Sequence, residues 1–264
     1  MYIDAHCHLE EATYAEELPD VIARALEAGL SHFIAVGASG VLAGAHEAIA
    51  LASRVPQVFA TCGVHPHDAG SVTPSVVETL ESLLRAPKVV ALGEVGLDYY
   101  YDNAPRAQQR AFFEETLRMA DRVELPIMLH IRDAHEDCLH ILDHIGVPSA
   151  GGVVHCFTAG PKEAEAYLAR GFFLSIPGVV TFKTAELLRE AVQMMPEDRI
   201  LLETDCPYLA PVPYRGKRNE PSYLPATAAA VGMLRGTTGM HVGMAASANT
   251  KRLFRLPCIM TSPS

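Results

Sequence analysis

Short apolar runs alternate with longer amphipathic segments along most of the chain. The runs are rich in Val, Ile and Leu, as expected of parallel strands that are buried on both faces. Eight of them are predicted as strands, near residues 2–6, 32–38, 58–64, 89–95, 126–131, 151–156, 172–177 and 200–204. Apolar residues at three- and four-residue spacing predict helices between them, at 15–29, 41–54, 74–86, 106–124, 134–145, 161–170 and 183–195.

This repeat of strand and helix predicts an α/β fold, a (β/α)8 TIM barrel. An open doubly wound sheet has the same repeat and is the alternative, because periodicity does not report whether a sheet closes. Two further segments, 223–235 and 243–255, are predicted as terminal helices packed on the outside. With 264 residues, 49% of them hydrophobic, the chain is long enough for one large core. We expect a single domain over residues 1–256 and a flexible tail over 257–264.

Composition limits the compartment in which the protein works. No apolar stretch is long enough to cross a membrane, and the chain opens on a strand-like run without a signal segment. The six cysteines are scattered and predict reduced thiols. Cys7, Cys156 and Cys206 each stand beside a candidate ligand and are expected to turn away from it. A cytoplasmic protein is predicted, with a monomer slightly favoured over an oligomer.

Candidate metal ligands stand at the ends of these apolar runs. They are His6, His8, Glu94, His130, His155 and Asp205. In a barrel the carboxyl ends of the strands converge on one face, so residues far apart in the sequence can share an ion. An open sheet would hold its first and eighth strands too far apart, and the ligand set therefore favours the barrel.

Imidazole and carboxylate ligands in this arrangement predict a metal-dependent hydrolase. The two histidines of the first run point to the same side of an extended strand and, with Asp205, are predicted to hold one ion. Glu94 offers two oxygens and is predicted to bridge to a second ion held by His130 and His155. Two divalent ions, roughly 3.5 to 4 Å apart, would activate a water molecule. Glu94 and Asp205 are the predicted catalytic residues, Asp205 also accepting the proton of that water.

Longer motifs recur along nearly the whole chain. They are DAHCHL at 4–9, GVHPH at 63–67, GEVGLDYY at 93–100, LPIMLHIRDA at 125–134, HCF at 155–157, ETDCPYLAP at 203–211, RGKRNEP at 215–221 and NTKRLF at 249–254. In this order they resemble the TatD-like metal-dependent deoxyribonucleases, a branch of the amidohydrolase-type barrels. The resemblance implies metal ligation by the same six residues and cleavage of single-stranded DNA from its 3′ end. Ile131, where the family often has Ser, and residues 158–160 depart from the pattern without touching a ligand.

Six further residues are candidates for substrate binding: His65, Arg132, Glu203, Arg215, Lys217 and Arg218. Arg132 is predicted to bind a phosphate in forked geometry, and Glu203 to hold a ligand histidine in its metal-binding tautomer. The alternative is a structural ion pair between Arg132 and Glu203. His65 is placed where a substrate phosphate approaches, although a surface histidine is the alternative for it and for His67. Residues 214–220 form a basic loop that either contacts phosphates or is only solvated.

The segment 98–101 follows a strand end and carries an acid before three tyrosines. Tyr99, Tyr100 and Tyr101 are candidates to stack on bases, with packing as the alternative. Asp98 either orients a ligand or caps a turn.

The formal net charge of −10 argues against a broad basic surface that grips duplex DNA. The favoured function is a 3′–5′ exodeoxyribonuclease that uses two divalent ions, with Mg, Mn, Zn, Ni and Co all compatible with the ligands. The runner-up is an amidohydrolase or esterase that acts on a small metabolite with the same site. A third reading is a non-catalytic protein that keeps the fold and works through its surface.

Overall fold

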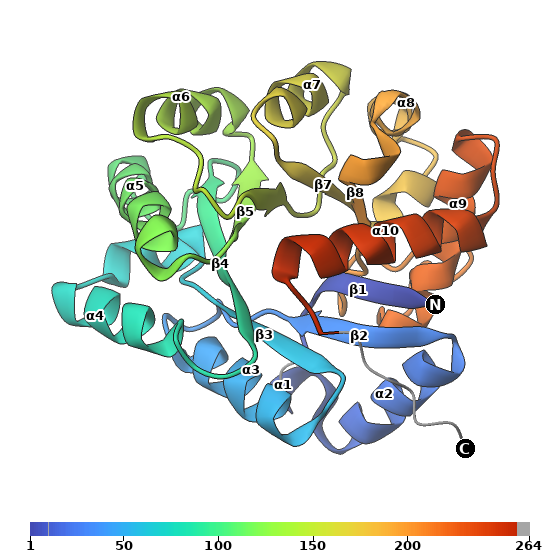
Figure 1. The fold of residues 1–264 in the computed structure, drawn as a ribbon, viewed down its shortest axis with the longest axis horizontal. Helices are drawn as coiled ribbons and strands as arrows, with labels where there is room; N and C mark the ends of the chain where they lie inside the picture. The colour runs from blue at the N-terminus through green and yellow to red at the C-terminus, as the bar shows by residue number, and fades with distance from the viewer. Residues whose placement is uncertain (10, 258–264) are drawn as a thin grey trace.

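The computed structural model describes residues 1–9 and 11–257, and its strands form one sheet of eight in chain order. Every neighbouring pair from β1 to β8 is parallel. The strands are β1 Tyr2–Cys7, β2 Leu30–Ala35, β3 Val58–Cys62, β4 Val89–Asp98, β5 Ile127–Arg132, β6 Gly152–Val154, β7 Phe173–Ile176 and β8 Ile200–Leu202. Figure 1 shows the strands at the centre of a ring of helices.

The ring closes between the first and last strands. The backbone N–H of Asp205 donates to the His6 carbonyl oxygen at 3.0 Å, and the N–H of His8 donates to the Cys206 carbonyl oxygen at 2.8 Å. These bonds join the carboxyl end of β1 to the residues that follow β8. The predicted (β/α)8 barrel is therefore confirmed, and the open doubly wound sheet is wrong.

A buried carboxyl group strengthens this closure. Asp4 on β1 accepts the backbone N–H of Thr204 at 2.9 Å and the hydroxyl of the same residue at 2.5 Å. Asp4 has no solvent exposure, and burial raises its pKa well above the ordinary value. Residues 200 positions apart are thus fixed together immediately before the ligands at the ends of their strands.

Helices surround the barrel in the predicted alternation. They are α1 Glu11–Tyr14, α2 Leu18–Glu27, α3 Ala43–Arg54, α4 Pro74–Leu83, α5 Arg106–Val123, α6 His135–Ile145, α7 Pro161–Ala169, α8 Glu186–Met194, α9 Leu224–Leu234 and α10 Gly239–Phe254, with short 3-10 turns η1 Ala15–Glu17, η2 Pro66–Ser71, η3 Gly178–Thr181, η4 Glu197–Arg199 and η5 Pro221–Tyr223. In α5, Phe112, Phe113 and Leu117 recur at helical spacing and are buried. This apolar face holds the helix against the barrel.

Several strands differ in length from the predicted runs. β6 ends at Val154 and β8 ends at Leu202, whereas β4 continues to Asp98. Apolar sequence alone does not mark where ladder hydrogen bonds stop. His155 and Asp205 consequently lie in the loops that follow their strands.

The last helix covers one end of the barrel. Leu253 and Phe254 at the end of α10, with Leu256 beyond it, pack in one buried cluster with Ile3 and other side chains near the amino ends of the strands. Figure 1 shows α10 lying across the barrel beside β1. The amino end is therefore closed, and the carboxyl end is left for the site. Of the tail predicted over residues 257–264, only Pro257 is among the described residues, and the rest lies outside them.

No helix in the described part of the chain has the length and apolar character needed to span a membrane.

A buried histidine near the amino end of β2 predicts that the stability of the fold decreases in acid. His32 is 1% exposed and its ring stacks on Phe59. Burial, helped by the positive charges of Lys251 and Lys88, lowers the pKa of His32 to about 4. In the unfolded chain His32 takes up a proton below about pH 6.5, whereas in the folded protein it does so only near pH 4. The stability that depends on neutral His32 is therefore present above about pH 6.5 and is lost as the pH falls toward 4.

The prediction compares wild type with His32→Phe, which keeps an aromatic ring at this position. From about pH 7 to about pH 5, wild type is expected to lose about 2 kcal/mol more of its free energy of unfolding than the variant. Urea denaturation at the two pH values measures the difference. Equal losses in the two proteins would contradict this account of His32.

Candidate metal centre

The predicted ligands form one cluster at the carboxyl end of the barrel. They are contributed by β1 and the residue that follows it, by β4 and β5, and by the loops after β6 and β8: His6, His8, Glu94, His130, His155 and Asp205. Parallel strands in a closed barrel all end on the same face, which brings these distant residues together.

Glu94 lies at the centre of the cluster, and its two oxygens face different histidines. Oε1 is 2.7 Å from the His130 Nδ1 atom and 2.7 Å from the His155 Nε2 atom. Oε2 is 3.7 Å from the His6 Nε2 atom and 3.9 Å from the His8 Nε2 atom. This is the arrangement that a carboxylate adopts when it bridges two cations.

The first group of ligands consists of His6, His8 and Asp205. The Nε2 atoms of the two histidines are 3.2 Å apart, and each is 3.5 Å from the Asp205 Oδ1 atom. These three side chains can converge on one ion. The backbone of Asp205 is left-handed, with φ 54°, a conformation that Asp tolerates better than most residues.

The second group contains His130, whose tautomer follows from its partners. The Asp98 Oδ2 atom lies 3.0 Å from the His130 Nε2 atom and is an acceptor, so the proton is placed on Nε2. Burial lowers the pKa of His130, but its hydrogen bonds to Asp98 and Glu94 outweigh burial and raise that pKa; loss of the Nδ1 proton would free the lone pair that faces Glu94 for a cation. A carboxylate that holds the far side of a ligand histidine in this way is common at metal sites.

His155 completes this second group, and Glu203 lies behind its ring. The His155 Nδ1 atom is 3.6 Å from the Glu203 Oε1 atom, long for a hydrogen bond but on the side away from Glu94. Glu203 is fully buried and accepts the backbone N–H of Cys156 at 2.6 Å. The structure therefore places Glu203 behind a candidate ligand rather than in the path of a substrate.

His65 also borders the cluster. Its Nε2 atom is 3.6 Å from the Glu94 Oε1 atom, and its ring meets that of His130 edge-on at 4.4 Å. However, its Nδ1 atom accepts the backbone N–H of His67 at 3.2 Å, which puts the proton on Nε2. A protonated Nε2 donates a hydrogen bond and does not bind a metal, so this tautomer suits contact with a substrate oxygen.

Burial and charge set the protonation of the cluster. Burial, followed by the nearby charge of His155, lowers the pKa of His6 well below its ordinary value. Burial lowers the pKa of His155 as well, but the charges of Glu94 and Glu203 outweigh it and raise that pKa well above the ordinary value. Burial opposes ionisation of Glu94, yet His155 and His130 hold its pKa well below the usual range.

These side chains fit divalent cations. The Nε2 atoms of His6 and His8 face each other at 3.2 Å, and in the tautomers that carry the proton on Nδ1 both are acceptors, a pair that a cation between them would satisfy. An ionised Glu94 with 2% exposure adds negative charge at the centre. Cation binding takes the place of the proton that the carboxylate otherwise draws onto His155.

Arg132 lies at the rim of the cluster rather than among the ligands. Its guanidinium carbon is 4.1 Å from the centre of the Tyr100 ring and 4.8 Å from that of Tyr101. Glu203 is occupied elsewhere, with His155, so the alternative of an Arg132–Glu203 ion pair is wrong. Stacking on the two rings holds the guanidinium in place and leaves its N–H groups at the rim.

The basic loop is more engaged with the protein than its sequence suggests. The Arg218 guanidinium pairs with Glu17, and that of Arg215 lies 3.9 Å from the centre of the Phe182 ring. Lys217 is exposed and has no ion pair with the residues that the structure describes. Of the three cations, Lys217 is therefore the one best able to reach a phosphate.

Asp98 plays both of the roles that its sequence position left open. Its Oδ1 atom accepts the backbone N–H groups of Tyr100 and Tyr101, which caps a turn, and its Oδ2 atom contacts His130 and His67 at 3.0 Å each. Our set of predicted site residues omits Asp98. The signal that finds it is strand alternation, because Asp98 stands four positions after Glu94 on β4 and shares its face.

The cysteines beside the ligands do not all turn away. Cys7 does so, since its thiol donates to the Ile34 carbonyl oxygen at 3.3 Å. Cys156 does not: burial and then the adjacent Asp205 carboxylate raise the pKa of its thiol well above the ordinary value. Strand alternation fails here because β6 ends at Val154 and Cys156 has a left-handed φ of 44°.

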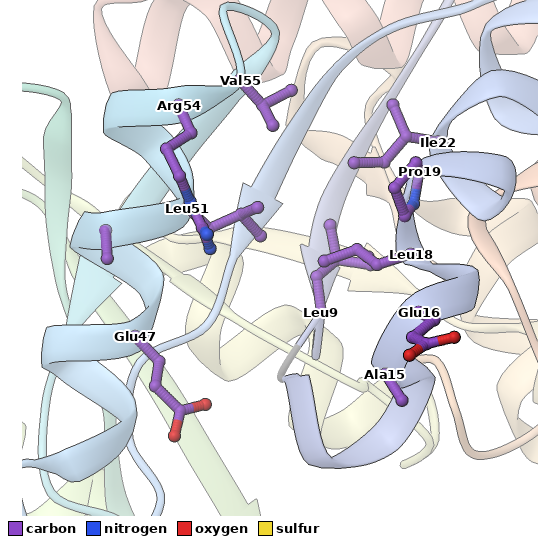
Figure 2. Close-up of a pocket in the computed structure, with 11 residues that line it drawn as sticks. Leu9, Ala15, Glu16, Leu18, Pro19, Ile22, Glu47, Leu51, Arg54 and Val55 are labelled. Carbon is purple, nitrogen blue, oxygen red and sulfur yellow. The ribbon is translucent and has the colours of Figure 1, made fainter.

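A separate hollow of about 540 Å³ lies between α2 and α3 (Figure 2). Leu9, Leu18, Ile22, Leu51 and Val55 give it a mainly apolar lining. Its charged side chains, Glu16, Glu47 and Arg54, come from η1 and α3. Among the described residues this lining includes no imidazole, so we place the hydrolytic chemistry at the cluster instead.

A (β/α)8 barrel that gathers histidines and carboxylates at the carboxyl ends of its strands defines the class of metal-dependent hydrolases. The sequence matches the family described as TatD related DNase over residues 3–255. The chain belongs to this family, and it is an enzyme of the metal-dependent hydrolase class.

Individual relatives resemble the chain over nearly its full length. An uncharacterized metal-dependent hydrolase, YabD of Bacillus subtilis, is 38% identical over 97% of this chain and 100% of its own. The 3′-5′ ssDNA/RNA exonuclease TatD of Salmonella typhimurium is 35% identical over 96% of this chain and 98% of its own. Among solved structures, the TatD homologue YjjV of Escherichia coli superposes with a TM-score of 0.90 at 29% identity, covering 97% of this chain and 98% of its own.

Proposed function

We propose that the protein is a two-metal nuclease that removes nucleotides from the 3′ ends of single-stranded DNA. The observation that carries the proposal is Glu94, whose Oε1 atom faces His130 and His155 and whose Oε2 atom faces His6 and His8. A carboxylate shared between two cations holds them at the short separation that suits two-metal hydrolysis of a phosphodiester. Relatives named as 3′-5′ ssDNA/RNA exonucleases support the choice of substrate.

Each ligand has a proposed place in the centre. His6, His8 and Asp205 would hold one cation and His130 and His155 the other, with the Glu94 carboxylate between the two groups. When bound, the two cations supply an activated water and offset the negative charge of the phosphate. The imidazole-rich donor set accepts Zn, Mn, Ni or Co, and Mg is compatible with the carboxylates.

The chain itself orients the substrate and moves the proton. Asp205 is the proposed proton acceptor because it is 8% exposed at the edge of the first group of ligands. The Nε2–H group of His65 donates to a phosphate oxygen beside Glu94. Arg132 and Lys217 bind neighbouring phosphates, whereas Arg215 and Arg218 position their loop. This small number of cations suits a few nucleotides at a free end better than a long duplex.

Digestion of end-labelled single-stranded DNA after metal removal tests this function. Dialysis against a chelator is expected to abolish cleavage, and added Mg or Mn is expected to restore it, because the proposal assigns the activation of water to the two cations. A 3′ label is expected to appear first in mononucleotides, while a 5′-labelled strand shortens stepwise.

Three results would count against the proposal. Undiminished cleavage in chelator would contradict the role of metal, and release of the 5′ label first would contradict the polarity. A metal-loaded protein that leaves DNA intact but hydrolyses a small ester, lactone or cyclic amide would replace the nuclease with a small-metabolite hydrolase.

A further inference from the structure

Exposed tyrosine rings stand on two sides of the histidine cluster. Tyr100 is 59% exposed, Tyr101 is 53% exposed and Tyr208 is 61% exposed. Tyr100 and Tyr101 follow β4, and Tyr208 follows β8. In a closed ring of eight strands in chain order, three strands separate β4 from β8 in either direction. The two sets of rings therefore lie on opposite sides of the mouth of the barrel.

The first side is a stacked group of Tyr100, Tyr101 and Arg132. The two tyrosine rings meet edge-on at 4.8 Å, and the guanidinium of Arg132 covers both, at 4.1 Å and 4.8 Å. The Tyr101 ring also meets the His67 ring edge-on at 5.3 Å. Arg132 has no ion pair and no side-chain hydrogen bond within the described residues, so its planar N–H groups are available to a phosphate.

This first side is held in register with the metal centre. One oxygen of Asp98 accepts the backbone N–H groups of Tyr100 and Tyr101, at 3.0 Å and 2.9 Å. The other oxygen contacts the ligand His130 at 3.0 Å. A single carboxylate thus fixes both the aromatic rings and a histidine of the second group of ligands.

The second side is Tyr208, which is tied to the first group of ligands. Its ring lies 6.1 Å from the His8 ring, near-perpendicular to it. Its backbone N–H donates to the Asp205 carbonyl oxygen at 3.0 Å, and its carbonyl oxygen accepts the buried Asn219 amide at 2.6 Å. The backbone beneath the exposed ring is therefore fixed.

We infer that these two aromatic surfaces clamp nucleobases on either side of the phosphate that is cleaved. The inference rests on the proposed nuclease function and specifies how its substrate is held. One base stacks against the Tyr100–Tyr101–Arg132 group, and a second stacks against Tyr208, with the phosphate between them at Glu94. Stacked bases must be unpaired, which selects single strands. Every base has an aromatic face, so the clamp tolerates any sequence.

The test compares substitutions that remove a ring with substitutions that keep it. Tyr101→Ala and Tyr208→Ala are each expected to raise KM for single-stranded DNA about tenfold or more, with little change in kcat at saturation. Tyr101→Phe and Tyr208→Phe retain the stacking surface and are expected to stay within about twofold of wild type. Metal content and thermal unfolding of the four variants, compared with wild type, identify any damage to the centre or the fold.

An oligonucleotide with abasic sites in its two terminal positions supplies the second arm. If the clamp binds bases, wild type shows the raised KM on this substrate, and the alanine substitutions raise it no further. Two results would overturn the clamp without affecting the nuclease proposal. One is an equal wild-type KM for the intact and the abasic oligonucleotide, and the other is an equal rise in KM on both oligonucleotides in the alanine variants. Absence of nucleic-acid cleavage by metal-loaded wild type would overturn the nuclease proposal itself.

Discussion

Replacing Glu94 with Gln is expected to lower kcat/KM by about 10³-fold, which corresponds to about 4 kcal/mol of transition-state stabilisation. The amide has no charge and keeps only one oxygen, so it cannot serve the two histidine groups that the two carboxylate oxygens of Glu94 face. Loss of metal is expected together with loss of activity. Elemental analysis of the purified protein and initial rates on single-stranded DNA measure the two effects.

The matched control is Glu78→Gln, which makes the same chemical change at an exposed position of α4. This variant is expected to keep the metal content and rate of wild type. If Glu94→Gln bound a full complement of metal and cleaved at the wild-type rate, the central role assigned to Glu94 would be wrong.

Asp4→Ala is expected to lower the free energy of unfolding by about 3 kcal/mol, because it leaves the backbone N–H of Thr204 buried without an acceptor and removes a second bond to the hydroxyl. The same substitution loosens the closure that brings His6 beside Asp205. Metal affinity is therefore expected to fall by about 10- to 100-fold, as when the residues that support metal ligands are removed. Urea denaturation and metal titration measure the two losses.

Asp4→Asn separates these effects from the simple loss of an acid. Burial raises the pKa of Asp4 and so opposes its ionisation, and Asn retains an acceptor for the Thr204 N–H and a donor for its hydroxyl oxygen. The Asn variant is expected to lie within about 1 kcal/mol of wild type. A loss as large as that of Asp4→Ala would mean that the charge of Asp4, and not its hydrogen bonds, matters.

The barrel and its candidate ligands were accessible to sequence reasoning because each ligand follows an apolar run. Strand burial on both faces produces those runs, and the ends of parallel strands are where a barrel places polar groups. Glu94 and His130 could be located in this way without coordinates. The exact strand ends could not, since β6 and β8 stop after three residues each while the apolar sequence continues.

What the sequence left open depended mainly on pairs of residues that are distant in the chain. The far side of the His130 ring, for example, is held by Asp98 on the neighbouring strand. The pairing of Arg218 with Glu17, far away in the chain, is likewise invisible in the sequence of the basic loop. Patterns along one segment describe which residues share a face, but not which partner each of them meets across the fold.

The closure of β8 onto β1 has a consequence for the nascent protein. His6, His8 and Glu94 lie on or just after the first four strands, whereas His130, His155 and Asp205 lie on or after the last four, so neither half of the barrel holds all of the candidate ligands. His6 leaves the ribosome about 10 to 40 seconds before Asp205, at ordinary rates of translation. A chain that ends before Asp205 therefore lacks one of the proposed ligands, and a centre of this composition would form only once β8 has closed onto β1.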